Sequence, residues 1–180
     1  MMTYILSMII GGAAGMAIGL IGELIYKGYK RKMFRRLTND SKLCMGKFAQ
    51  QLYEIACEDM SMDYKIWIAI VDLGVGNYGS TIQDPVARRS SMIKVNPDQT
   101  MLDFIDTIFH EARHVYQALN TPVDIFDVEY INSIDDPLGY YEQPIEKDAR
   151  EYAALAMKKY KRRINKLVKQ YYTKEYYTEY

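Results

Sequence analysis

The sequence predicts an α+β protein in which one N-terminal transmembrane helix precedes a small domain of helices and strands. Three observations support this prediction. Residues 3–22 are apolar and uncharged, two short segments are rich in β-branched residues, and three longer segments repeat apolar residues at helical spacing. With 180 residues, the chain is long enough for one ordinary domain and too short for two substantial ones.

The composition excludes several classes of protein. A hydrophobic content of 49% excludes a disordered chain, and two cysteines cannot form a disulfide scaffold. The net charge of zero hides three unlike segments: residues 1–40 sum to +4, residues 41–154 to −10 and residues 155–180 to +6. Partners therefore have to be inferred from the segments rather than from the total.

The transmembrane helix is predicted within residues 1–26. At about 1.5 Å per residue, the uncharged stretch 3–22 would cross a hydrocarbon core of about 30 Å. Six basic residues follow in a linker over residues 27–40, which predicts a single-pass protein whose C-terminal domain is cytoplasmic. Gly11, Gly15 and Gly19 offer a face for homo-oligomer formation in the membrane. The alternative is an apolar helix buried in a soluble core or oligomer.

The elements of the domain follow in order. Asn39, Asp40 and Ser41 are suitable N-caps for an amphipathic helix over residues 41–58. Residues 65–71 are predicted to form a buried strand that ends in a glycine-rich turn, and residues 91–95 a second strand. The next helix begins at Asn96 or Thr100 as its cap and ends near residue 119.

This helix carries the sequence His110-Glu-Ala-Arg-His114, an HExxH motif that contains both histidines of the chain. Histidines four apart project in nearly the same direction, so both imidazoles can reach one Zn²⁺. Glu111 would then take a proton from a zinc-bound water that attacks a carbonyl. Both histidines lie nearly opposite the apolar stripe of the same helix, so we do not expect ordinary core histidines.

A catalytic zinc site needs a third protein ligand, and no further histidine is available. After an irregular stretch over residues 120–141, a helix is predicted to begin near Pro144. Glu146 and Asp148 lie on either edge of its buried stripe, and Glu142 lies one turn earlier, so the pattern leaves all three open. Its small residues at positions 149 and 153 would allow the motif helix to approach closely.

The motif and this helix together resemble a known family. HExxH followed 32 residues later by an ExxA sequence (residues 146–149) resembles the gluzincin metallopeptidases. Residues 144–153 are also similar to compact zincin-like peptidases of bacteria and their phages. The resemblance covers about residues 45–157 and implies Zn²⁺ held by His110, His114 and Glu146, with Glu111 as the catalytic base. It also implies that Asp148 accepts the free ring N–H of a ligand histidine.

The resemblance further implies the fold of residues 41–170, a zincin-like domain with helices packed on a short sheet. The edge strand would line the cleft and pair with an extended peptide substrate, and we expect residues 91–95 to be that strand. Tyr140, Tyr141 and Arg113 are candidates for stabilising the oxyanion. Residues 158–180, including a tyrosine-rich tail over 171–180, are predicted to form a solvated helix end, or else to contact the anionic leaflet.

The sequence therefore predicts a membrane-anchored, zinc-dependent metallopeptidase that acts on peptides or proteins, with no nucleic-acid partner. Two hypotheses from other classes remain. One is a zincin-like domain that binds zinc or a peptide as a sensor or adaptor without cutting it. The other is a glycine-rich membrane assembly protein whose remaining domain is only a scaffold.

Overall fold

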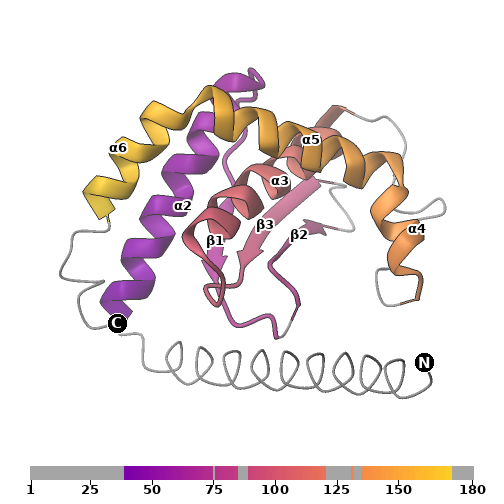
Figure 1. Cartoon of the computed structure of the whole chain (residues 1–180), viewed down its shortest axis with the longest axis horizontal. Helices are drawn as coiled ribbons and strands as arrows, with labels where there is room; N and C mark the ends of the chain where they lie inside the picture. Colours follow the sequence, from indigo (N-terminus) through magenta and orange to yellow (C-terminus); the bar gives the residue numbers. More distant parts are fainter. Residues whose placement is uncertain (1–38, 75, 85–88, 121–130, 132–134, 172–180) are drawn as a thin grey trace, which may run out of the picture. The chain divides into compact units, whose positions relative to one another are not determined.

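The computed structural model describes residues 39–74, 76–84, 89–120, 131 and 135–171. Within them the fold is α+β, as predicted: helices pack with a three-stranded sheet (Figure 1). No helix in this part is both long and apolar enough to cross a membrane. The segment for which the transmembrane helix is predicted, residues 3–22, lies outside the described residues, as do residues 172–180 of the tail.

Helix α2 spans Asn39–Asp59, in agreement with the helix predicted over 41–58. Its apolar residues recur three and four apart and are almost completely buried: Phe48, Ala49, Leu52, Tyr53, Ile55 and Ala56. The helix ends in a Schellman motif, since Ser61 has a left-handed backbone with a φ of 51° and the Met62 N–H donates to the Cys57 carbonyl at 2.8 Å. The chain is thereby turned toward the first strand.

The sheet contains β1 (Trp67–Ile70), β2 (Gly79–Asp84) and β3 (Arg89–Val95) in the order β1-β3-β2. β1 is parallel to β3, whereas β2 is antiparallel to it. The two predicted strands are present, but β1 is not the buried strand that was expected, because Trp67 is exposed and its other residues are half-buried. The prediction that residues 91–95 form an edge strand is also wrong, because β3 lies between the other two. The missed strand, β2, has the sequence GSTIQD, which lacks the apolar alternation of a half-buried strand.

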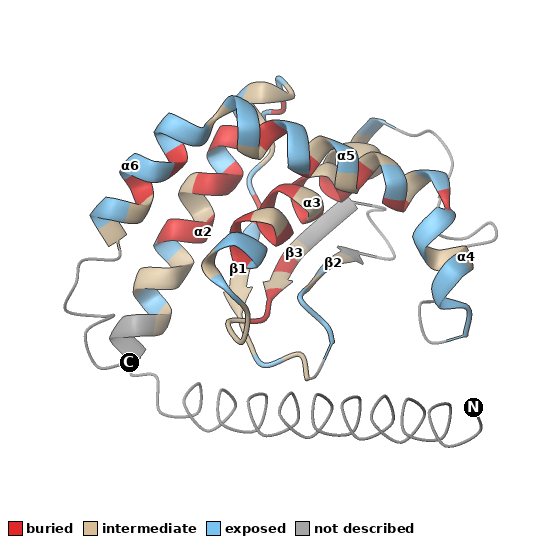
Figure 2. Cartoon of the chain, in the orientation of Figure 1, coloured by how far each residue is buried: buried red, intermediate tan, exposed pale blue. Residues whose placement is uncertain are grey.

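Helix α3 spans Met101–Asn120 and lies at the centre of the domain (Figure 2). Thr100 is its cap, since its hydroxyl accepts from the Asp103 N–H at 3.2 Å and donates to the Asp103 carboxylate at 2.7 Å. The other predicted cap, Asn96, instead donates to the carbonyls of Gly74 and Asn77, both at 2.9 Å, in the loop before β2. α3 contacts β2 and β3, α2 and α5, so it is buried on more than one face.

The chain from residue 135 onward is more helical than predicted. Helix α4 (Pro137–Glu142) occupies the end of the stretch expected to be irregular, with Asp136 capping it through the Gly139 N–H at 3.0 Å. Helix α5 (Pro144–Lys159) begins at the predicted proline, and Ala149 and Ala153 are fully buried where it packs on α3. Their small side chains permit the close approach that was expected.

Helix α6 (Lys161–Tyr171) follows a single intervening residue after α5 and runs beside α2 (Figure 1). Ile164 and Leu167 belong to the hydrophobic core, together with the buried face of α2. Residues 161–171 therefore form a packed helix with one solvated face, rather than a helix end that is solvated on all sides. The basic residues of this segment face solvent, while every third or fourth residue is apolar and buries itself against α2.

Candidate metal centre

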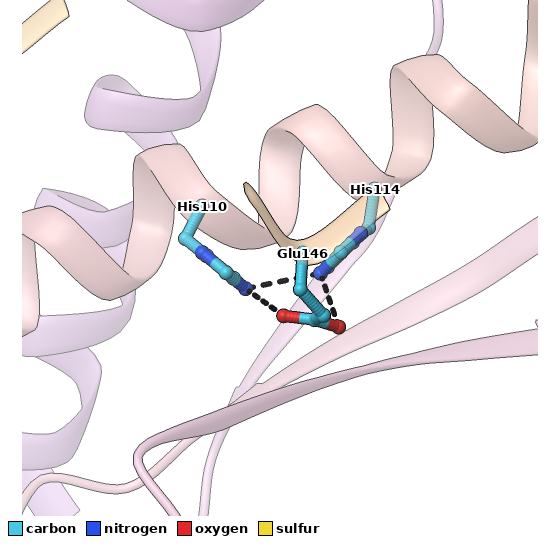
Figure 3. Close-up of side chains that lie close together, drawn as sticks. All are labelled: His110, His114 and Glu146. Carbon is cyan, nitrogen blue, oxygen red and sulfur yellow. Dashed lines mark hydrogen bonds and ion pairs between the residues drawn. The ribbon is translucent and has the colours of Figure 1, made fainter. Parts of the chain in front are cut away.

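Three side chains from two helices converge on one point (Figure 3). His110 and His114 come from successive turns of α3, and Glu146 comes from the first turn of α5. The two histidine Nε2 atoms lie 3.0 Å apart. Glu146 Oε2 lies 3.2 Å from the Nε2 of His110, and Oε1 lies 3.3 Å from that of His114. The structure thus brings together the three residues that the resemblance implied as ligands.

The cluster is more enclosed than the sequence suggested. The side chains of Glu146 and His114 are only 2% and 7% exposed, and that of His110 is 16% exposed. The histidines do lie away from the apolar stripe of α3, but α5 covers that side of the helix as well. His114 is therefore a buried polar group and His110 a partly buried one, and both need partners, because desolvating a polar side chain costs several kcal/mol when it is left unpaired.

The electrostatics of the cluster favour a cation. Burial disfavours the ionised form of Glu146, but the hydrogen bonds from His110 and His114 outweigh it and hold the pKa of its carboxyl far below the usual range. Burial likewise disfavours the imidazolium of His114, yet the hydrogen bond to Glu146 and the nearby carboxylates of Glu111 and Glu146 raise its pKa. Both pKa shifts favour an ionised Glu146 carboxylate with a positive charge beside it.

The spacing of the three donor atoms can be compared with that required by zinc. With metal–ligand bonds of about 2.0–2.1 Å in a tetrahedron, neighbouring donors lie about 3.3 Å apart. The two Nε2 atoms lie 3.0 Å apart, and each lies 3.2 or 3.3 Å from a different oxygen of Glu146, while one ligand atom from each residue lies within 4.8 Å of the other two. Two imidazole nitrogens and one carboxylate oxygen form a donor set typical of zinc, with a fourth position left for another ligand. The residues therefore fit the ion.

Glu111, the predicted catalytic base, lies between the two histidines in sequence and is buried. Thr81 on β2 donates from its hydroxyl to Oε2 of Glu111 at 2.7 Å, which fixes the orientation of the carboxylate. β2 can approach α3 this closely because residue 79 is glycine: a Cβ there would lie 2.5 Å from Cγ2 of Thr107 and 3.0 Å from Oε1 of Glu111. Sequence reasoning missed Thr81 and Gly79 because it missed the strand that carries them.

Asp148 does not belong to the three-residue cluster. It accepts two hydrogen bonds from Arg113, at 2.7 and 3.0 Å, and one from the Gln117 amide at 2.7 Å. We expected Asp148 to accept the free ring N–H of a ligand histidine. Gln117 takes that place instead, since its Oε1 lies 2.8 Å from Nδ1 of His114. Gln117 was missed, although a polar residue three positions after a histidine on the same helix face is a signal that could have indicated it.

The remaining candidates lie elsewhere. Glu142 is exposed at the end of α4. The guanidinium of Arg113 is engaged with Asp148 and lies over the rings of Tyr116 and Tyr152, at 4.7 and 5.3 Å. Tyr141 lies under the Arg150 guanidinium at 3.7 Å. Arg113 is thus committed to a structural ion pair rather than being available to an oxyanion.

Taken together, fold and site define an α+β protein with a buried cluster of two histidines and one carboxylate that is suited to a metal ion. A family model described as "Protein of unknown function (DUF3920)" matches residues 71–164, more than half of the chain, and the protein therefore belongs to that family. The matched range contains every residue of the cluster, together with Glu111, Gln117 and Asp148. No curated protein and no solved structure matches the chain.

Proposed function

We propose that the protein is a zinc-dependent metallopeptidase, anchored to a membrane through its N-terminal segment. The observation that carries the proposal is the convergence of His110 Nε2, His114 Nε2 and the Glu146 carboxylate within 4.8 Å of one another, with Glu111 on the same helix. His110, His114 and Glu146 would hold the ion. When bound, Zn²⁺ supplies a Lewis acid that makes water acidic enough to react near neutral pH.

The remaining chemistry belongs to the chain itself. Glu111 takes the proton of the attacking water on its carboxylate and returns it to the leaving amine, as a general base and then a general acid. Thr81 keeps Oε2 of Glu111 in place through the hydrogen bond at 2.7 Å. Burial of this carboxylate limits its contact with bulk water, which strengthens its electrostatic interaction with the reacting groups.

A peptide is the substrate class that the neighbouring strand favours. β2 is a terminal strand of the described sheet, and Thr81 on it contacts the proposed base directly. An extended peptide aligned beside residues 79–81 would therefore pass close to Glu111. Addition of a strand to a sheet edge is a common mode of peptide recognition.

The membrane anchor is proposed from sequence alone. It depends on the uncharged residues 3–22 and the basic residues that follow them, and both lie outside the described residues. A domain held at the membrane in this way would act on substrates at the cytoplasmic surface.

A second candidate is a zinc-binding sensor that does not hydrolyse peptides. It is favoured by the enclosure of the cluster, in which Glu146 and His114 are almost completely buried. Structural zinc sites are closed, whereas catalytic sites keep one position accessible to water and substrate.

The test is metal analysis of the purified full-length chain, combined with hydrolysis of a diverse peptide library. The wild type is expected to hold about one zinc per chain, and His110→Ala and Glu146→Gln to lose it. Glu142→Gln, a matched change at an exposed glutamate four residues earlier, should retain it. Glu111→Gln should retain zinc and lose hydrolysis by about 10²–10⁴-fold. A wild type without zinc would refute both candidates, and bound zinc without turnover would favour the sensor.

A further inference from the structure

Behind the metal cluster, a row of polar side chains runs from α3 to α5. His114 contacts Gln117, Gln117 contacts Asp148, and Asp148 contacts Arg113, over distances of 2.7–3.0 Å. None of these contacts involves the ring nitrogen of His114 that faces Glu146. The row therefore acts on the opposite side of the imidazole, at Nδ1.

The orientation of the Gln117 amide follows from its two other partners. Its nitrogen lies 3.0 Å from the Ile145 carbonyl oxygen and 2.7 Å from Oδ2 of Asp148, and both of these atoms can only accept. The amide NH₂ must therefore face α5, so Oε1 must face His114. Since that oxygen can only accept, the proton of the 2.8 Å contact has to reside on Nδ1 of His114.

The position of Asp148 is fixed in turn by Arg113. The guanidinium donates two parallel hydrogen bonds to the carboxylate, at 2.7 and 3.0 Å, which is the geometry of a bidentate pair. Asp148 thus stays an acceptor, and the Gln117 amide cannot reverse without placing its oxygen against a carboxylate.

We propose that Gln117 is a positioning residue that keeps the proton of His114 on Nδ1, and that Asp148 and Arg113 hold Gln117 in the orientation this requires. With the proton on Nδ1, the lone pair of Nε2 is directed toward the cluster, where a metal ion needs it. The inference rests on the proposed zinc site. It assigns to Gln117 the task that the sequence had led us to expect of Asp148.

Two measurements on the full-length chain test the proposed role of Gln117. In ¹H–¹⁵N NMR spectra of the imidazoles, wild-type His114 should carry a slowly exchanging, hydrogen-bonded proton on Nδ1, with or without zinc. Gln117→Met, which keeps the volume and removes the hydrogen bond, should abolish this signal and weaken zinc binding by about 10- to 100-fold in competition titrations. Gln170→Met, the matched change at an exposed position of α6, should alter neither, and the His110 ring signals serve as an internal reference.

A pair of variants distinguishes positioning from simple packing. Gln117→Glu still accepts from Nδ1 but sets a second carboxylate against Asp148, so zinc affinity should fall. Adding Asp148→Asn removes that repulsion and restores a donor, so the double variant should bind zinc more tightly than Gln117→Glu alone. This comparison decides the matter even if Gln117→Met does not fold.

Two results would overturn the inference: a wild-type His114 that carries no proton on Nδ1, or variants at Gln117 whose zinc affinity and ring signals match the wild type. These outcomes are distinct from failure of the proposed function. If the wild type binds no zinc, the peptidase proposal fails, while the proton position on His114 in the metal-free protein still decides the role of Gln117.

Discussion

Gly79 provides a quantitative test of how closely β2 packs on the motif helix. In Gly79→Ala the added Cβ would lie 2.5 Å from Cγ2 of Thr107 and 3.0 Å from Oε1 of Glu111. Thr107 cannot easily yield, because it is β-branched, buried, and donates from its hydroxyl to Gln99 at 3.0 Å. Overpacking of this kind costs about 1–3 kcal/mol.

The substitution also has a favourable contribution. Replacing glycine in a strand recovers about 0.5–1 kcal/mol of backbone entropy. The clash is the larger effect, so we expect Gly79→Ala to lower the free energy of unfolding by about 0.5–2 kcal/mol. For a chain of this size, at about 2–4 °C per kcal/mol, that corresponds to a decrease in Tm of about 1–8 °C. Zinc content should remain unchanged, whereas hydrolysis should fall because the Glu111 carboxylate is displaced.

The matched control is Gly46→Ala, in the interior of α2, where a Cβ would meet nothing within 4 Å. Here only the gain in helix propensity remains, so the unfolding free energy should rise by about 0.5–1 kcal/mol. Thermal and urea unfolding of both variants measure the two effects. If Gly79→Ala proved as stable as the wild type, β2 could not lie as close to α3 as the structure has it.

Two further predictions concern the junction of α5 and α6 with α2. Burial opposes ionisation of Asp59, but hydrogen bonds from Lys159 and Tyr160 outweigh it and lower the pKa of its carboxyl. Its stabilising contribution is therefore complete above the unfolded pKa of about 3.9 and is lost as the pH falls through the folded value. Urea unfolding of Asp59→Asn between pH 2 and 7 should show a shallower dependence on pH than the wild type, and an identical dependence would exclude this ion pair. Leu167→Ala should cost about 2–3 kcal/mol, whereas Lys166→Ala, at the exposed neighbouring position, should cost less than about 0.5 kcal/mol. Equal effects of these two changes would mean that α6 does not pack on the core.

The parts of the fold that could be predicted from sequence are those whose burial leaves a periodic pattern. The helical spacing of apolar residues located α2, α3 and the start of α5, and the β-branched runs located β1 and β3. The capped, proline-initiated start of α4 at Asp136 and Pro137 was also visible in the sequence but was not used. β2 could not be found in this way, because it packs on α3 through glycine and threonine rather than through large apolar side chains.

The residues of the candidate site likewise divide into those that a local sequence pattern predicts and those that it does not. Two histidines four apart on a helix and a glutamate at the start of another are local features, and the structure brings the three together. The contact between Gln117 and Asp148 depends instead on how α3 and α5 are rotated against each other, which no local pattern specifies. The same holds for the contact between Thr81 and Glu111.

The origin of the three cluster residues on two separate helices has a thermodynamic consequence. An ion held by α3 and α5 would crosslink them only in the folded chain, so its binding would add to the free energy of folding. At a free zinc concentration 100 times Kd, the gain is about 2.7 kcal/mol, a large share of the 5–15 kcal/mol that typically separates folded from unfolded domains. With zinc as the proposed ion, its supply would then affect the folded fraction of the protein as well as the proposed activity.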